Sequence, residues 1–346
     1  MAKKLGNIKN NISSLYYSWL NNNYKLILSQ FLKKKSYHAF IFCSIHGIGT
    51  IDLIYALIKW ILCTNKNYLN NCEKCKNCIL IKTGNHPDLY IIKKKYGHIN
   101  ISIDDIRNII DNIYNNSYRD QGKIIWLPFA KQLNNSSSNA LLKILEEPPK
   151  NTWFFIQCYN KSDLLPTISS RCQIWYINPP SEKDGLYWLN KKLNNNYEKK
   201  IIITALRICN YSPINAYKLL NSALWIQRKK LYEIFVSAIK HDILYLLKIL
   251  NTKNVLLYFN WLYLILIDVI KYHLKLRKNF FYNIDQFNLI LEISKIINLN
   301  NIFLIIDDLL YYRNCLINII NINQKLVLIR FLLSLEKKIN IFNNKN

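Results

Sequence analysis

One segment, residues 139–172, restricts the fold of this chain more than any other. Residues 139–147 favour a helix, and the double proline Pro148-Pro149 ends it, because proline lacks the backbone N–H that a helix interior needs. The apolar run Trp153-Phe154-Phe155-Ile156 follows and predicts a buried strand. A tight turn then displays the arginine of Ser170-Arg171-Cys172. Strands and helices alternate in this way up to about residue 177, which predicts a parallel sheet covered by helices on both faces.

A strand is also predicted at residues 39–43, and two glycines, Gly47 and Gly49, follow it just before a helix. This is the position of a phosphate-binding loop, in which a lysine contacts the β- and γ-phosphates and the next hydroxyl holds Mg²⁺. Here Gly49 is followed by Thr50 and Ile51, so both of these polar contacts are missing. We therefore expect a degenerate phosphate loop that binds no ATP.

The acidic element of an ATPase is absent as well. It should follow the strand predicted at residues 123–127, where an ATPase places Asp-Glu to hold the metal and orient water. This chain has Pro128-Phe129-Ala130 at that point. Two independent losses favour a chain that keeps the fold of an ATPase without hydrolysing ATP. The alternative is a divergent ATPase that uses other residues.

Four cysteines have the spacing of a zinc site: Cys63, Cys72, Cys75 and Cys78. The last three follow the knuckle pattern, and four thiolates suit tetrahedral Zn²⁺ and leave no open position for water, so we expect a structural ion. A disulfide framework is disfavoured, because the nine cysteines are odd in number and no signal peptide opens the chain. His86 is interpreted as a turn cap. The other cysteines are interpreted as buried structural residues: Cys43, Cys158, Cys172, Cys209 and Cys315.

In their order, these motifs resemble the clamp-loader branch of the AAA+ ATPases, and in particular the δ′ (delta prime) subunits of the bacterial DNA polymerase III clamp loader. The second half matches weakly. The resemblance implies that Arg171 reaches in trans into a neighbouring subunit's ATP site. It rests on ordered matches in the first half of the chain: Tyr55-Ala56-Leu57, Leu62-Cys63, the cysteine cluster, Gly84-x-His86-Pro87-Asp88, Ile103-Asp104-x-Ile106-Arg107, Asn139 to Lys143, Trp153-Phe154-Phe155 and Ser170-Arg171-Cys172.

The expected fold class is α/β plus all-α, in three domains. The break at Asn178-Pro179-Pro180 marks the first boundary. The apolar run at residues 255–267 is shorter than the roughly 20 residues of a membrane-spanning helix, so we expect a buried bundle helix and no membrane contact. The predicted domains are an AAA+-like domain at residues 1–177 with the zinc module at 63–78, a helical lid domain at 178–220, and a helical oligomerisation (collar) domain at 221–346.

The net charge of +26 would ordinarily indicate a nucleic-acid partner. Lys, Asn, Ile and Tyr are abundant in the chain, however, while Gly, Ala and Val are sparse, which is typical of codon drift toward A and T. Much of the excess charge is therefore interpreted as solvated surface lysine. Weak attraction to DNA phosphates within an assembly remains open.

The main functional hypothesis is a non-hydrolysing stator subunit of the clamp loader. By resemblance, it acts within the DNA polymerase III holoenzyme, a DNA-directed DNA polymerase and nucleotidyltransferase, and no catalysis of its own is predicted. Its implied partners are the clamp-loader ATPase subunits and the delta subunit, with the sliding clamp and primed DNA reached through the assembled complex. The implied location is the cytoplasm, at the nucleoid when assembled.

Two alternatives stay open. An active ATP-hydrolysing motor subunit is opposed by Thr50, Ile51, Pro128 and Phe129. A free zinc-knuckle nucleic-acid-binding protein would explain the charge, but it leaves the ATPase-like order of motifs and the displayed arginine unexplained.

Overall fold

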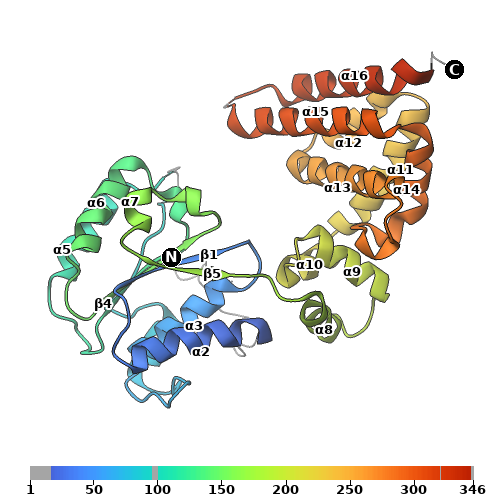
Figure 1. Ribbon diagram of the computed structural model, residues 1–346. Coiled ribbons are helices and arrows are strands. Elements are labelled where there is room, and N and C mark those ends of the chain that lie inside the picture. Colours follow the sequence, from blue (N-terminus) through green and yellow to red (C-terminus); the bar gives the residue numbers. More distant parts are fainter. Residues whose placement is uncertain (1–16, 96–99, 320, 344–346) are drawn as a thin grey trace. The chain divides into compact units, whose positions relative to one another are not determined.

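The computed structural model describes residues 17–95, 100–319 and 321–343. The chain divides into two compact units, Met1–Pro180 and Ser181–Asn346 (Figure 1). The boundary falls at the proline pair that the sequence marks as a break. The first unit alternates strands with helices, and the described part of the second is helical. The expected fold class is therefore confirmed, whereas the finer division of the second unit into lid and collar stays a prediction.

The elements of the first unit begin and end where local signals place them. The Asn134 side chain accepts the Ser137 N–H at the start of α6, and Ser102 caps α5 in the same way. The helix α6 ends at Glu146, just before the double proline. In chain order the elements are η1 (Ser18–Leu20), α2 (Asn21–Leu32), β1 (Ala39–Ser44), α3 (Thr50–Leu62), α4 (Lys76–Thr83), β2 (Leu89–Ile91), α5 (Ile103–Ile113), β3 (Lys123–Leu127), η2 (Ala130–Gln132), α6 (Asn135–Glu146), β4 (Thr152–Cys158), η3 (Lys161–Asp163), α7 (Pro166–Ser169) and β5 (Gln173–Ile177).

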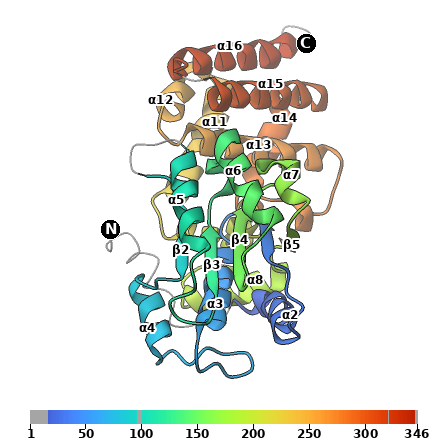
Figure 2. The same ribbon diagram turned by 90° about the vertical axis from the view of Figure 1, so that its left-hand side faces the viewer.

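The five strands form one parallel sheet in the order β2-β3-β4-β1-β5. Figure 2 labels β2, β3, β4 and β5 in this order across the sheet, and β1 pairs with both β4 and β5 between them. In the register of β1 with its neighbours, Cys43 lies opposite Cys158 of β4 and Tyr176 of β5. Because the strands are parallel, the phosphate-like loop after β1 and the segments after β3 and β4 leave from the same edge of the sheet.

Helices cover both faces of this sheet, as Figure 1 shows. Alternate strand residues point to opposite faces. Phe40, Phe42 and Phe155 pack against α2 and α3 in one buried cluster. Ile41 and Ile156 pack in a second cluster with α5, α6 and α7. Burial on both faces explains why these strands are almost continuously apolar.

The second unit has a single buried core that runs through all of its larger helices, from Leu189 in α8 to Ile339 in α16. Ser212 and Pro213 stand at the N-cap and first position of α10, where the fixed φ of proline suits the start of a helix. The elements are α8 (Glu182–Lys192), α9 (Lys199–Ile208), α10 (Pro213–Leu220), α11 (Leu224–Lys240), η4 (Ile243–Leu246), α12 (Leu247–Leu250), α13 (Val255–His273), η5 (Lys278–Phe280), η6 (Ile284–Gln286), α14 (Phe287–Ile296), α15 (Leu299–Asn318) and α16 (Gln324–Asn343).

The apolar run at residues 255–267 belongs to α13. Within the described part of the chain, this is the one helix long and apolar enough on its own to cross a membrane, with a mean hydropathy of 1.6, and 61% of the tested stretch is buried inside the protein. The helix pair at Ile284–Ile296 and Leu299–Asn318 passes the same criterion only when joined across a bend of 108°. The side chains of Trp261, Ile265 and Val269 are fully buried, as the prediction of a core helix requires.

Candidate functional site

The structure brings together the four cysteines predicted to bind zinc. Cys63 follows the last residue of α3, Cys75 is the N-cap of α4, and Cys78 lies in the first turn of that helix. Cys72 lies in the loop between the two helices. The four sulfur atoms lie within 4.8 Å of one another.

The distances between sulfur atoms fit a tetrahedral ion. A regular tetrahedron with metal–sulfur bonds of about 2.3 Å has edges of about 3.8 Å. The Cys63 Sγ lies 3.5 Å from the Cys72 Sγ and 3.9 Å from the Cys75 Sγ, and the Cys72 and Cys78 Sγ atoms are 4.0 Å apart. The cluster could therefore hold a metal ion such as zinc.

Backbone N–H groups point at these sulfur atoms. The N–H of Cys75 donates to the Cys72 Sγ at 3.3 Å, and the N–H of Cys78 donates to the Cys75 Sγ at 3.4 Å. Donors from Cys75 and Lys74 lower the pKa of the Cys72 thiol. Burial opposes ionisation of Cys75, but hydrogen bonds from Thr64 and Cys78 outweigh it and bring the Cys75 pKa to about 5. The loop thus favours the thiolate form that a metal ion requires.

The other two cysteines are more deeply buried. Burial is the main cause that raises the pKa of Cys63, and it raises the pKa of Cys78 to about 12. A bound cation would displace the protons of these two thiols. The Asn71 side chain donates to the Cys78 Sγ at 3.7 Å. This hydrogen bond from within the loop would stabilise negative charge on the Cys78 sulfur.

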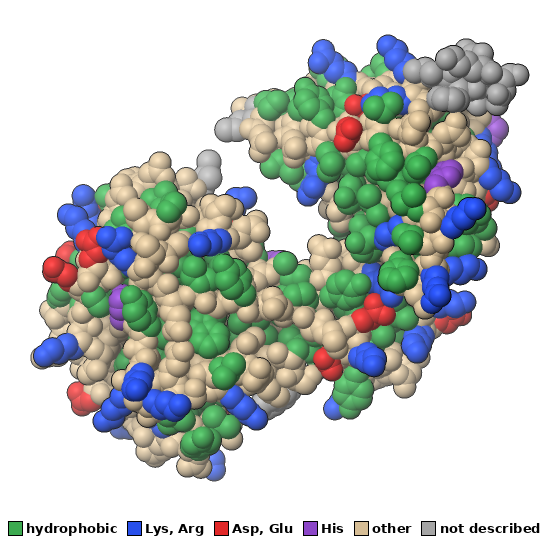
Figure 3. Space-filling model, viewed as in Figure 1, with side chains coloured by type: hydrophobic (Ala, Val, Ile, Leu, Met, Phe, Trp, Pro, Cys, Tyr) green, Lys and Arg blue, Asp and Glu red, His purple; other side chains and the backbone are tan. Residues whose placement is uncertain are grey.

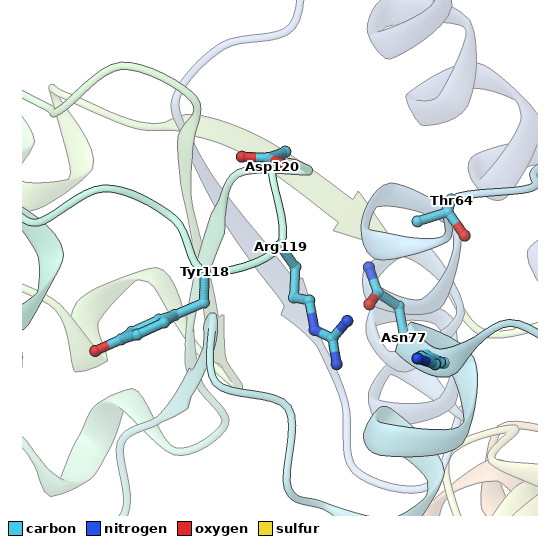
Figure 4. A pocket seen from close by; sticks show the side chains of 6 residues that line it. Thr64, Asn77, Tyr118, Arg119 and Asp120 are labelled. Atoms are coloured by element: carbon cyan, nitrogen blue, oxygen red, sulfur yellow. The ribbon is translucent and has the colours of Figure 1, made fainter.

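A shallow pocket of about 330 Å³ lies beside the cysteine loop (Figure 4). The Arg119 side chain extends across it toward Asn77 of α4. The Asn77 amide also donates to the Leu62 carbonyl at 2.8 Å, which ties α4 to the end of α3. The pocket thus places a guanidinium beside α4, the helix that carries Cys78.

The degenerate phosphate loop, which joins β1 to α3, has the backbone of a tight turn. Gly47 and Gly49 have φ angles of 84° and 99°, a region that favours glycine. A Cβ atom at Gly49 would meet the ring of Tyr17 at 2.6 Å, and the Trp19 indole donates to the Ile48 carbonyl at 3.0 Å. Aromatic side chains from the start of the described chain therefore lie against this loop.

The polar groups that a nucleotide would need are absent here. The Thr50 hydroxyl, at the position of the phosphate-binding lysine, is buried and donates to the Ser44 hydroxyl at 2.7 Å. Ile51, at the position of the Mg²⁺-binding hydroxyl, packs against the core of the first unit. Pro128 and Phe129 follow β3, where the carboxylates would stand.

Arg171 follows α7, a one-turn helix where the sequence predicted only a turn. Its guanidinium forms an ion pair with the Glu146 carboxylate at 2.6 Å, and it also donates to the Thr167 carbonyl at 3.0 Å. The side chains of Arg171 and Glu146 are 37% and 48% exposed. A single exposed pair of this kind stabilises a protein by only about 0–1 kcal/mol, so it holds the arginine weakly.

Sequence reasoning missed the role of Asp88, which is fully buried. Its two carboxylate oxygens accept the N–H groups of Tyr118 and Arg119, both at 2.9 Å, and so fix the loop that carries Arg119. His86 accepts the Asp88 N–H through its Nδ1 atom at 3.2 Å, which confirms it as a turn cap. The spacing His86-Pro87-Asp88 signals a turn, but it does not reveal a partner thirty residues away.

Comparisons with known proteins point to one family. Residues 19–181 match the family model described as DNA polymerase III, delta subunit, and residues 222–337 match DNA polymerase III, delta subunit, C terminal. DNA polymerase III subunit delta' of Buchnera aphidicola subsp. Schizaphis graminum is 37% identical over 325 residues, covering 93% of this chain and 97% of that protein. The Yersinia pestis protein of the same name is 32% identical, covering 93% and 95%. Among solved structures, a DNA polymerase III gamma subunit-related protein from Thermotoga maritima is 18% identical in sequence, with a TM-score of 0.47. The match covers 91% of this chain and 99% of that protein.

Proposed function

The chain belongs to the DNA polymerase III subunit delta' family, and from that membership we propose that it is a clamp-loader subunit that does not hydrolyse ATP itself. One observation carries this proposal. The parallel sheet and its glycine turn are intact, yet the lysine, hydroxyl and carboxylate positions hold Thr50, Ile51, Pro128 and Phe129. An ATPase fold that lacks the residues for ATP binding and hydrolysis suits a structural or stator role in a ring of related subunits.

Arg171 supplies the proposed link to catalysis. Its planar guanidinium can pair with phosphate oxygens of an ATP bound by a neighbouring subunit. The exposed position after α7 and the weak pair with Glu146 leave it free to exchange partners. In this proposal the chain contributes an arginine in trans to an ATPase site that it does not itself contain.

The proposed partners are the clamp-loader ATPase subunits and the delta subunit, with the sliding clamp and primed DNA reached through the complex, in the cytoplasm. Exposed apolar side chains on α15 and α16 favour such contacts, because isolated proteins rarely expose large apolar patches. Figure 3 shows hydrophobic side chains on the surface of the second unit, while Lys and Arg side chains are spread over both units. The exposed apolar residues of these two helices include Phe303, Leu304, Tyr311, Ile317, Leu326 and Leu333.

We further propose that the cysteine cluster holds a structural zinc ion. Four thiolate donors at tetrahedral distances leave no position for a catalytic water. The ion would fix the loop between α3 and α4 against the first unit. It takes no part in the proposed ATP chemistry.

Reconstitution tests the proposed function. The full chain is co-expressed with the ATPase and delta subunits, and ATP turnover of the purified complex is measured with and without clamp and primed DNA. We expect the chain to join the complex and to be required for clamp-stimulated turnover. Calorimetry on the isolated chain should detect no Mg²⁺-dependent ATP binding at micromolar concentrations. Tight ATP binding by the isolated chain would instead support the motor alternative, and failure to join the complex would refute the proposal.

A further inference from the structure

A second pair of cysteines lies close together outside the zinc cluster. Cys43 is the second-to-last residue of β1, and Cys158 is the last residue of β4. The two residues lie opposite each other in the parallel register. Residues paired in this way point to the same face of the sheet, and both side chains belong to the core beneath α5, α6 and α7. Their sulfur atoms are 2.9 Å apart.

This geometry meets the requirements of a disulfide bond. Neighbouring strands are about 4.8 Å apart, which lies within the usual Cα separation of about 4.4–6.8 Å for bonded cysteines. The sulfur atoms would approach by about 0.9 Å to reach a bond length of about 2.05 Å. A gap of this size between the two sulfur atoms is one that rotation of the two side chains can close.

We propose that Cys43 and Cys158 are a redox modification site, at which a peroxide converts the two thiols into a reversible disulfide that joins β1 to β4. The pair is distinct from the four cysteines of the predicted zinc site. It also differs from Cys172, Cys209 and Cys315, for which the structure describes no sulfur partner.

The chemistry balances with hydrogen peroxide as the oxidant. The Cys43 thiol loses its proton, its sulfur attacks one peroxide oxygen, and the O–O bond breaks. The departing hydroxide combines with the proton that Cys43 released to give water, and Cys43 is left as a sulfenic acid. The Cys158 sulfur then attacks the Cys43 sulfur and loses its proton. The S–O bond breaks and a second water leaves. Two electrons pass from the two sulfur atoms to the peroxide, and a thiol reductant reverses the change.

Two observations make Cys43 the attacking residue. It is the more accessible of the pair, 6% exposed against 2% for Cys158, and the exposed residues Ile45 and His46 follow it closely in the chain. A hydrogen bond from the Cys158 thiol lowers the pKa of Cys43, burial opposes this, and the charge of Lys161 adds to it. The same contact raises the pKa of Cys158, which suits the residue that resolves the sulfenic acid.

The position of the bond gives the modification a consequence. The chain after Cys43 forms the phosphate-like loop, and the chain after Cys158 leads through η3 and α7 to Arg171. A bond between residues 115 positions apart in the sequence would fix the starting points of both segments relative to each other. The bond would also lower the conformational entropy of the unfolded chain, which favours the folded state.

Peptide mapping of the full, zinc-loaded chain tests the site. Trypsin places Cys43 in a peptide of residues 36–59 and Cys158 in a peptide of residues 151–161, and neither peptide contains another cysteine. After brief peroxide treatment and alkylation, we expect the two peptides to be cross-linked, with a combined mass lower by about 2 Da through the loss of two hydrogens. The cross-link should disappear on reduction, while Cys209 and Cys315 remain alkylated.

Single variants test the order of the steps. In Cys158→Ala, a dione reagent specific for sulfenic acids should label Cys43, whereas in Cys43→Ala it should leave Cys158 unlabelled. The reverse labelling would overturn the assignment of Cys43 as attacking residue. Absence of the cross-link in the wild-type chain, under conditions in which Cys209 or Cys315 is oxidised, would overturn the site itself. Zinc content is measured in parallel, so that oxidation of the metal-binding cysteines is scored separately.

Discussion

At the scale of single residues, Arg171 separates a catalytic from a structural interpretation. An arginine supplied in trans can raise the rate of phosphoryl transfer by about 10³–10⁵-fold, equivalent to roughly 4–7 kcal/mol at the transition state. An exposed ion pair contributes about 0–1 kcal/mol. We expect Arg171→Ala to leave folding, zinc content and assembly intact, but to slow hydrolysis at the adjacent ATP site and impair clamp loading, as measured by single-turnover ATPase assays on the reconstituted complex.

Glu146 provides the matched control for this prediction. Its carboxylate is the partner of Arg171 in the isolated chain, so Glu146→Gln removes the same ion pair while keeping the guanidinium. Turnover in the Glu146→Gln complex should stay close to wild type. Equal losses in both variants would mean that the ion pair, and not the arginine, matters.

His86 carries a second prediction at this scale. Burial lowers the pKa of His86, the nearby Asp88 opposes the change, and the charge of Arg119 adds to it. The unfolded chain therefore binds this proton more readily, with a pKa of about 6.5, and stability must fall as the pH drops below about 7. We expect this residue to contribute a slope of at most about 1.4 kcal/mol per pH unit, seen in denaturant titrations between pH 7 and 5.

The variant His86→Asn isolates that contribution. An asparagine oxygen can accept the N–H two residues on, as His86 Nδ1 does, but it does not titrate in this range. The stability of the variant should depend less steeply on pH than that of the wild type. Identical slopes would show that His86 has the same pKa in the folded and unfolded chains.

At the scale of elements, we expect the cysteine loop between α3 and α4 to depend on the proposed zinc ion. Structural zinc sites contribute an apparent 10–16 kcal/mol or so of binding free energy, comparable with the whole stability of a domain at about 5–15 kcal/mol. Cys72→Ala should abolish stoichiometric zinc, measured by elemental analysis, and speed hydrogen exchange in α4. Cys209→Ala, which changes a cysteine of the second unit, should do neither. Because the proposed zinc ion would have to displace the proton of Cys78, whose pKa is about 12 without metal, zinc binding should also weaken as the pH falls.

Sequence patterns predicted the elements better than the contacts between them. The strand at Lys123–Leu127 and the end of α6 just before the double proline follow from local signals that act over a few residues. The pair of Cys43 with Cys158 was interpreted as two separate buried cysteines, because the register that joins them is set by the whole sheet. The partner of Arg171 escaped prediction for the same reason, since it depends on how α6 and α7 pack.

At the scale of the whole molecule, the helices of the second unit share one buried core. The predicted boundary near residue 220 would cut through a single buried core that joins α8 to α16. Arg207 of α9 reinforces this connection: it pairs with Glu182 of α8 at 2.9 Å and donates to the Asn279 and Phe281 carbonyls at 2.7 and 2.6 Å. Helices before and after residue 220 therefore depend on each other for burial.

Truncation at two points tests where assembly resides. The first unit buries its own sheet on both faces, so a fragment of residues 1–180 should be soluble and retain zinc, yet fail to co-purify with the ATPase and delta subunits. A fragment of residues 1–220 keeps α8, α9 and α10 without the helices that cover them, and exposed apolar surface should make it aggregate. Analytical ultracentrifugation and pull-down assays measure both outcomes. Assembly of the 1–180 fragment with the affinity of the full chain would place the contacts in the first unit. A soluble, monomeric 1–220 fragment would support the predicted boundary near residue 220.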